Sequence, residues 1–271
     1  MNPNDSTPNV SGLFTEAHAD GDLSTASYGV LSVADIGTQI QDALSMGVSA
    51  DDVAATRVVL YTALIDDSSS IAFKGNESAV RAGHNGVIEA LRASKAMDEI
   101  LAQTRYINGL TLHSYRFLAD VPLLDRSNYQ ARGSTPLYDQ TIVTLGSVIA
   151  KAREFERSGV PVNTVTLIVT DGNDQGSQAT AGQVRPIVED MLARESHIVA
   201  GMGISDGQTD FAQVFMEMGI LPQWILTPLS DPRAIRNAFQ LFSQSASAAI
   251  QGGGSFGSAS QSGLPVGGFG N

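Results

Sequence analysis

The chain lacks cysteine entirely, which excludes disulfide bonds and thiolate zinc centres. Its four histidines are scattered and show no helical spacing of the kind that metal-binding pairs use. Long apolar runs are also missing, since none approaches the roughly 18 residues that a membrane-spanning helix needs. The first ten residues have neither the basic nor the apolar region of a secretory signal peptide. These absences predict a cytoplasmic protein without membrane insertion.

Positive charge is scarce, and charge is unevenly spread. The 271 residues include 28 acidic and 16 basic side chains, for a formal net charge of −12. Residues 1–56 contain acidic side chains but no lysine or arginine, and residues 237–271 carry no formal charge. A nucleic-acid partner would favour a basic patch, so this composition argues against one. The length and the hydrophobic content of 42% predict one large domain with a well-buried core.

The chain divides into four segments. Residues 1–24 are polar and acidic, and we expect a disordered arm there. Residues 25–56 place apolar side chains at roughly helical spacing, which predicts a helical extension packed on the main domain. The main domain spans residues 57–250, and the segment 251–271 is rich in glycine and serine, which predicts a flexible tail.

The main domain alternates strand-like and helix-like segments. Strands are predicted at residues 57–65, 107–117, 119–125, 164–170, 197–204 and 223–229. Helices are predicted at residues 76–104, 135–159, 180–195, 210–218 and 231–249. The short turn before 119–125 and its Pro122 indicate an antiparallel edge strand. The alternation predicts a doubly wound, Rossmann-like α/β fold, with a mostly parallel six-stranded sheet, one short antiparallel edge strand and helices on both faces.

Polar side chains follow the predicted strands at the points where the strands end. The run LIDDSSSI places Asp66, Ser68 and Ser70 directly after the first strand. Thr135 stands at the start of a long helix, and Asp171 follows the strand that ends in LIVT. Because ligands bind beyond the carboxyl ends of the strands in such sheets, we expect these residues to share one rim. Carboxylates and hydroxyls are hard oxygen donors, which suit Mg²⁺, Mn²⁺ or Ca²⁺.

Simpler explanations exist for each residue taken alone. Serine and aspartate favour helix N-caps, so DDSSS by itself fits an ordinary capping turn, and Thr135 by itself fits helix capping. Asp67, Asp139 and Asp174 are weaker candidates for contacts to the metal or its waters, and supporting or solvated positions explain them better. Asp139 also fits the first turn of a helix, where the helix dipole favours negative charge. Only the whole constellation favours a metal site.

Taken together, the five residues resemble the metal-ion-dependent adhesion site, or MIDAS, of the von Willebrand factor A (vWA) domain. That site has the pattern DxSxS, followed by a threonine and then an aspartate. The resemblance covers about residues 57–245. One position departs from the family, because the middle of the first motif is often glycine and is Ser69 here. A side chain at this position can narrow the loop, but it does not remove a ligand.

The resemblance implies a metal site and a function. By the family's geometry, the hydroxyls of Ser68, Ser70 and Thr135 would approach the cation. Asp66 and Asp171 would bind it partly through water. We expect Mg²⁺, with Mn²⁺ or Ca²⁺ as alternatives. The implied role is a non-enzymatic protein-interaction module, in which an Asp or Glu of a partner protein completes the coordination. Many bacterial cytoplasmic members of the family work beside an AAA+ ATPase, so such an ATPase is the implied partner.

Two other functions remain open. A metal-dependent phosphotransfer enzyme of the haloacid-dehalogenase type also carries an aspartate after its first strand. That class resembles the pattern DxDxT, however, and position 68 is serine, so the acid for proton transfer is missing. The other alternative is a structural domain with an empty site, which acts through its acidic arm and its flexible tail.

Overall fold

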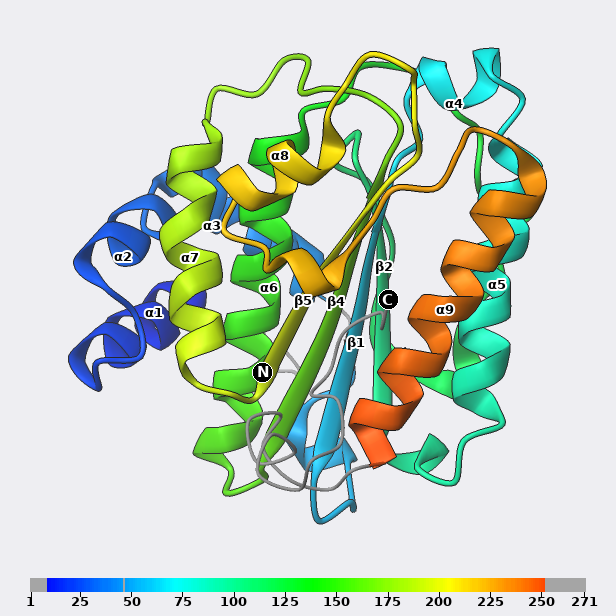
Figure 1. Cartoon of the computed structure of the whole chain (residues 1–271). Helices are drawn as coiled ribbons and strands as arrows, with labels where there is room; N and C mark the ends of the chain where they lie inside the picture. Colours follow the sequence, from blue (N-terminus) through cyan, green and yellow to red (C-terminus); the bar gives the residue numbers. More distant parts are fainter. Residues whose placement is uncertain (1–8, 46, 252–271) are drawn as a thin grey trace.

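A computed structural model gives the fold of residues 9–45 and 47–251. Within these residues, a six-stranded sheet has the order β3-β2-β1-β4-β5-β6 (Figure 1). The strands are β1 (Val58–Ile65), β2 (Ile100–Tyr106), β3 (Thr111–Phe117), β4 (Val162–Thr170), β5 (His197–Gly203) and β6 (Ile225–Leu226). All neighbouring pairs are parallel except β2 with β3. The predicted fold class is therefore confirmed.

Helices cover both faces of the sheet. On one face, α5 (Glu77–Arg92) packs against α9 (Pro232–Gln251) (Figure 1). Gly83 permits this close approach, because a Cβ there would lie 2.1 Å from the ring of Phe239. The other face carries α6 (Leu137–Arg157), α7 (Ala181–Ala193) and α8 (Phe211–Glu217). Every residue of β1 and β2 is consequently buried.

The second strand lies earlier in the chain than predicted. The sequence predicts a helix over residues 76–104, but α5 ends at Arg92, and residues 100–106 form β2. Polar residues interrupt the apolar pattern of this strand. They are buried through contacts that are distant in sequence; for example, Gln103 Nε2 donates to Ala43 O at 2.9 Å. A local pattern cannot reveal such partners.

The antiparallel edge strand is β3, not the predicted segment 119–125. A tight turn at Asn108 and Gly109 joins β2 to β3, and Gly109 has φ +97°, which favours glycine. Segment 119–125 forms no strand. Its backbone bonds to a helix side chain instead, because Leu124 N donates to Asn85 Oδ1 at 2.8 Å and Leu124 O accepts from Asn85 Nδ2 at 2.9 Å. One antiparallel edge strand exists as expected, but it is formed by other residues.

The N-terminal segment is folded where the structure describes it. A disordered arm is predicted over residues 1–24, and for residues 10–24 this prediction is wrong. Helix α1 (Val10–Ala19) buries an apolar side and is followed by α2 (Thr25–Leu31) and α3 (Ala34–Leu44). All three pack on α6, where Gly146 leaves room for Ile40; a Cβ at Gly146 would lie 2.4 Å from Ile40 Cδ1.

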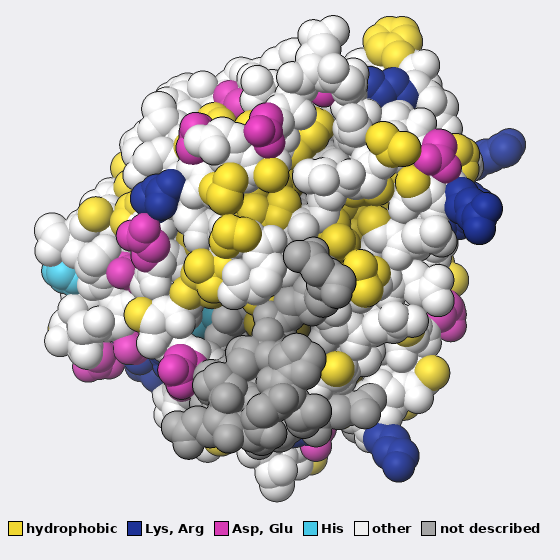
Figure 2. All heavy atoms as spheres, in the orientation of Figure 1, with side chains coloured by type: hydrophobic (Ala, Val, Ile, Leu, Met, Phe, Trp, Pro, Cys, Tyr) yellow, Lys and Arg dark blue, Asp and Glu magenta, His cyan; other side chains and the backbone are white. Residues whose placement is uncertain are grey.

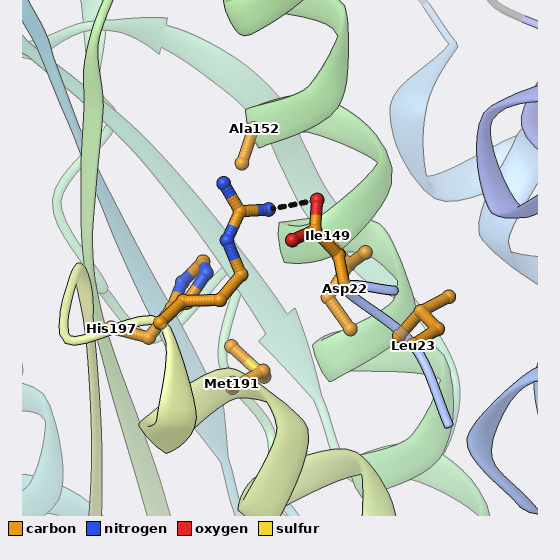
Figure 3. A pocket seen from close by; sticks show the side chains of 7 residues that line it. Asp22, Leu23, Ile149, Ala152, Met191 and His197 are labelled. Carbon is orange, nitrogen blue, oxygen red and sulfur yellow. Dashed lines mark ion pairs between the residues drawn. The ribbon is translucent and has the colours of Figure 1, made fainter. Parts of the chain in front are cut away.

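Arginines of the main domain balance the acidic charge of this segment. Arg153 Nη1 lies 2.7 Å from Asp22 Oδ2, and Arg153 also pairs with Asp20. Arg194 Nη1 lies 3.2 Å from the same Asp22 oxygen (dashed line in Figure 3). Figure 3 shows Asp22 at a small pocket between α6 and α7. These partners are more than 130 positions away in sequence, which explains why composition alone predicts disorder.

Two predicted segments fall largely or partly outside the described residues. The flexible tail, 251–271, is described only at Gln251, the last residue of α9, and residues 1–8 of the arm are not described.

In the described part of the chain, no helix is long and apolar enough to cross a membrane. Figure 2 shows apolar side chains gathered over α8 and the β6 edge of the sheet.

Candidate metal centre

The carboxyl ends of β1 and β4 lie side by side at one rim of the sheet. In their parallel register Ile65 pairs with Val169, and Asp66 N donates to Val169 O at 3.0 Å. Asp66 and Asp171 therefore become neighbours although 105 positions separate them. The short helix α4 (Ser69–Phe73) stands on this rim, at the top of Figure 1.

Asp66 fastens the two loops together. Its Oδ1 accepts a hydrogen bond from Ser68 N at 2.7 Å. Its Oδ2 accepts from Thr170 Oγ1 at 2.7 Å and from Asp171 N at 3.1 Å. The backbone O of Asp66 accepts from the buried Tyr129 hydroxyl at 2.5 Å. The carboxylate is completely buried, and the donors around it fix its orientation.

Hydroxyl groups converge beside Asp66. Ser68 Oγ and Ser70 Oγ lie 2.9 Å apart, and Ser70 Oγ donates to Asp171 Oδ1. A Cβ placed on Gly172 would lie 3.6 Å from Thr135 Oγ1 and 3.7 Å from Ser70 Oγ, so both hydroxyls face this glycine. The structure therefore brings together all five residues of the predicted site, which we call the oxygen cluster: Asp66, Ser68, Ser70, Thr135 and Asp171.

The Asp171 carboxylate has fewer hydrogen-bond donors around it than the Asp66 carboxylate has. It is completely buried, and burial raises its pKa above the ordinary value, whereas the hydrogen bond from Ser70 lowers it. Among the described residues, the contact to Asp171 Oδ2 is the ion pair with Lys74 Nζ, which lies 3.3 Å away. The same ammonium donates to Asp171 O at 3.0 Å. Asp171 thus keeps one buried oxygen with coordination capacity to spare.

Thr135 is positioned by its backbone rather than by its side chain. Gln175 N donates to Thr135 O at 2.8 Å, and the two residues form an isolated antiparallel bridge. This bridge holds the start of α6 against the loop that follows β4. Thr135 is buried at this junction, with 4% of the residue exposed.

Ser69, the position that departs from the vWA pattern, is hydrogen-bonded to Gly133. Its side chain turns away from the oxygen cluster and bonds to the segment that leads to Thr135. Ser69 Oγ accepts from Gly133 N at 3.0 Å, and Ser69 N donates to Gly133 O at 3.2 Å. Ser69 therefore ties two loops of the cluster to each other.

The three outer candidates each hold a loop. Asp67 Oδ1 accepts from Asn108 N at 3.1 Å, and burial raises the pKa of Asp67 to about 7. Asp139 Oδ1 accepts from Ala179 N at 2.8 Å. Asp174 Oδ1 accepts from the Ser177 hydroxyl at 2.5 Å. The structure thus gives all three carboxylates partners in the loops around the cluster.

Lys74 and Tyr129 belong to the site but were missed in the sequence. Lys74 ends α4 and reaches Asp171, and Tyr129 reaches the backbone of Asp66 from the segment before α6. No local pattern marks either residue, because both act through partners that are distant in sequence. In the sequence, only the closeness of Lys74 to Ser70, the last residue of the DxSxS motif, could have indicated that Lys74 lies at the site.

The donor set fits a hard divalent cation. Among the described residues, no group of three or more histidine, cysteine, aspartate or glutamate side chains could hold a metal by itself. The oxygen cluster instead combines two carboxylates with three hydroxyls, and the buried Asp171 Oδ2 has only Lys74 as a partner among the residues that the structure describes. Oxygen ligands of this kind suit Mg²⁺, Mn²⁺ or Ca²⁺.

Comparisons with known proteins give likenesses at low identity. No family model matches the sequence, and no curated protein matches it. The open form of the pilus adhesin SpaC from Lactobacillus rhamnosus GG is 12% identical, with a TM-score of 0.48, over 69% of this chain and 30% of the adhesin. Proximal thread matrix protein 1 from the mussel byssus, solved with a zinc-occupied MIDAS motif, is 14% identical, with a TM-score of 0.47, over 70% of this chain and 46% of that protein.

A third solved structure is matched over most of its length. The SpRpn10 VWA domain is 11% identical, with a TM-score of 0.47, over 68% of this chain and 94% of that domain. The chain spans less than half the length of the adhesin and of the mussel protein. The sheet order described above defines the fold. The candidate site is defined by the contacts within the oxygen cluster.

Proposed function

We propose that this chain is a non-enzymatic, divalent-metal-dependent protein-interaction module of the vWA type. The supporting observation is the convergence of Ser68, Ser70 and Thr135 hydroxyls with two buried carboxylates at the carboxyl rim of the sheet. A bound Mg²⁺, Mn²⁺ or Ca²⁺ would supply a Lewis-acidic position for an incoming carboxylate. The protein's own residues orient the donors, and loop hydrogen bonds keep them in place.

Exposed apolar side chains around the rim favour a protein partner. The three most exposed large apolar residues described are Phe73, Leu229 and Leu110, at 89%, 68% and 60% exposure. Phe73 follows β1, Leu110 lies in the turn after β2, and Leu229 follows β6, so each stands beyond a strand's carboxyl end. Isolated apolar side chains are common on surfaces, but their concentration on the rim of a polar site is typical of interfaces.

Two contacts tie these residues to the site. The turn that carries Leu110 is bonded to Asp67 through Asn108 N, at 3.1 Å. Ser230, next to Leu229, accepts from Asn76 Nδ2 at 2.9 Å, just after α4. We propose a partner segment in which an Asp or Glu is flanked by apolar side chains. An AAA+ ATPase as the partner stays a prediction that the sequence resemblance supports. A cytoplasmic location stays a prediction from the sequence alone.

The geometry argues against the phosphotransfer alternative. An aspartate nucleophile needs a carboxylate oxygen that can reach a phosphoryl group. Both oxygens of Asp66 are buried and accept hydrogen bonds from Ser68, Thr170 and Asp171. Position 68 also offers a hydroxyl in place of a general acid.

Thermal unfolding with and without metal tests the proposal. A ligand at a hundredfold excess over its Kd adds about 2.7 kcal/mol, which corresponds to a Tm rise of roughly 5–10 °C for a chain of this size. We expect this rise with Mg²⁺ or Mn²⁺ relative to EDTA. Thr135→Val should lose most of it, because the substitution keeps the shape and removes one donor.

Thr144→Val is the matched control. Thr144 is also buried, lies on α6, and its hydroxyl has no hydrogen-bond partner among the described residues. This variant should keep the full metal-dependent shift. Equal Tm values in metal and in EDTA for the unmodified chain, together with no metal binding by calorimetry, would overturn the proposal.

A further inference from the structure

Lys74 provides a positive charge at the buried carboxylate of the oxygen cluster. Its Nζ lies 3.3 Å from Asp171 Oδ2 and donates to Asp171 O at 3.0 Å. The Asp171 carboxylate is fully buried, whereas 29% of the Lys74 side chain is exposed. The ammonium therefore lies at the partly exposed edge of the cluster and contacts Asp171.

The oxygen that Lys74 approaches is the one left over by the rest of the site. Ser70 donates to Asp171 Oδ1, and in the described part of the chain no group other than Lys74 is a partner of Oδ2. A cation bound by Asp171, directly or through water, would share this carboxylate with the ammonium. Two positive charges at one buried carboxylate repel each other, and solvent screens this repulsion less than it does at the surface.

We propose that Lys74 is a tethered counter-ion that competes with the divalent cation for Asp171 and so sets the metal affinity of the site. Without metal, the ammonium neutralises one of two adjacent buried carboxylates, Asp66 and Asp171. With metal, it moves away from Oδ2, toward the exposed rim. This inference rests on the proposed metal-dependent function.

Two other roles for Lys74 make different predictions. An exposed surface ion pair contributes little, so its removal would leave metal binding unchanged. A residue that positions Asp171 for the metal would weaken metal binding when removed. A competing counter-ion makes the opposite prediction, because its removal strengthens metal binding and at the same time destabilises the metal-free protein.

The experiment is titration calorimetry of the full chain with Mn²⁺ alone as the probe. Lys74→Met keeps the length of the side chain and removes the charge, and Lys74→Arg keeps the charge. Lys95→Met is the control, because Lys95 is an exposed lysine that follows α5, at the end of the sheet where β2 begins. We expect Lys74→Met to bind Mn²⁺ about tenfold more tightly, a change that reflects one charge repulsion at reduced dielectric screening. Lys74→Arg and Lys95→Met should stay within about twofold of the unmodified chain.

Thermal unfolding in EDTA supplies the second readout. Lys74→Met should lower the metal-free Tm and increase the Tm rise produced by Mn²⁺. Equal or weaker Mn²⁺ binding by Lys74→Met, beside clear binding by the unmodified chain, overturns the role of Lys74 and leaves the proposed function intact. No Mn²⁺ binding by either protein overturns both.

Discussion

Ser69 and Gly133 join the first and second loops of the oxygen cluster by hydrogen bonds in both directions, and the Ser69 hydroxyl also donates to Gly133 O at 3.2 Å. Ser69 N donates to Gly133 O at 3.2 Å, and Gly133 N donates to Ser69 Oγ at 3.0 Å. The vWA pattern often has glycine where Ser69 stands, and a glycine could make only the bond from its backbone N to Gly133 O. The departure from the pattern therefore adds a tie between the DxSxS loop and the segment that carries Thr135.

Replacing Ser69 should loosen the cluster. Ser69→Ala removes the hydroxyl, and Ser69→Gly also frees the backbone. One such hydrogen bond contributes about 1 kcal/mol, so both variants should unfold at slightly lower denaturant concentration. Mn²⁺ affinity should fall by about fivefold, because Thr135 becomes less well fixed. Calorimetry checks this, and an unchanged Mn²⁺ affinity in both variants would show that the tie does not position Thr135.

The apolar rim should matter for the partner and not for the metal. Phe73→Ser and Leu229→Ser remove side chains that are mostly exposed, so both variants should keep the Tm and the Mn²⁺ affinity of the unmodified chain. Binding of a partner that is captured only with Mg²⁺ should weaken by at least about tenfold, because apolar anchors dominate interface energies. Surface plasmon resonance with that partner gives the measurement.

A matched apolar residue away from the rim provides the control. Val33 is 50% exposed and lies between α2 and α3, on the N-terminal helices. Val33→Ser should leave partner binding unchanged. If Val33→Ser weakens binding as much as Phe73→Ser does, the partner does not dock on the rim.

The stability of the N-terminal helices should depend far more on Arg153 than on Arg157. The Arg153 side chain is 11% exposed and pairs with both Asp20 and Asp22, whereas Arg157 and Glu16 are each about half-exposed at 3.4 Å. Arg153→Met should lower the free energy of unfolding by about 1–3 kcal/mol, because it removes the nearly buried partner of Asp20 and leaves Asp22 with Arg194 alone. Arg157→Met should change it by less than about 0.5 kcal/mol. Urea denaturation separates these outcomes, and equal costs would mean that burial does not decide the strength of these pairs.

The sequence predicts the placement of the five oxygen-cluster residues better than it predicts the elements around them. The strand before Asp66 and the strand before Asp171 are continuous apolar runs, so their ends, and the polar residues that follow them, can be located locally. β2 and α1 could not be recognised in this way. Gln103 is buried through a hydrogen bond to Ala43, and the acidic charge beside α1 is balanced by Arg153, so both depend on partners outside any local window. Lys74 could not be recognised from the sequence for the same reason, since its proposed role depends on its contact with Asp171, 97 positions away.

Acid should destabilise the protein partly through His197. Burial lowers the pKa of His197 to about 3, and the charge of Arg194 acts in the same direction. The unfolded chain has a histidine pKa of about 6.5, so below that pH the unfolded state binds a proton that the folded state refuses. The stability that neutral His197 contributes is complete above about pH 6.5 and is lost as the pH falls toward the folded pKa, at about 1.4 kcal/mol per pH unit.

Other groups titrate in the same pH range. The effect of His197 must therefore be measured as a difference in the free energy of unfolding between two proteins. Burial lowers the pKa of His84 and His113 to about 4, in the same direction, whereas Asp67, with its pKa raised to about 7, acts in the opposite direction. His197→Asn keeps an acceptor for the Thr164 hydroxyl, which lies 2.7 Å from His197 Nδ1, and removes the titration. The stability gap between the unmodified chain and His197→Asn should shrink by about 2 kcal/mol between pH 6.5 and pH 5. Urea denaturation at these pH values measures that gap; parallel pH profiles for the two proteins would mean that His197 titrates normally in the folded chain.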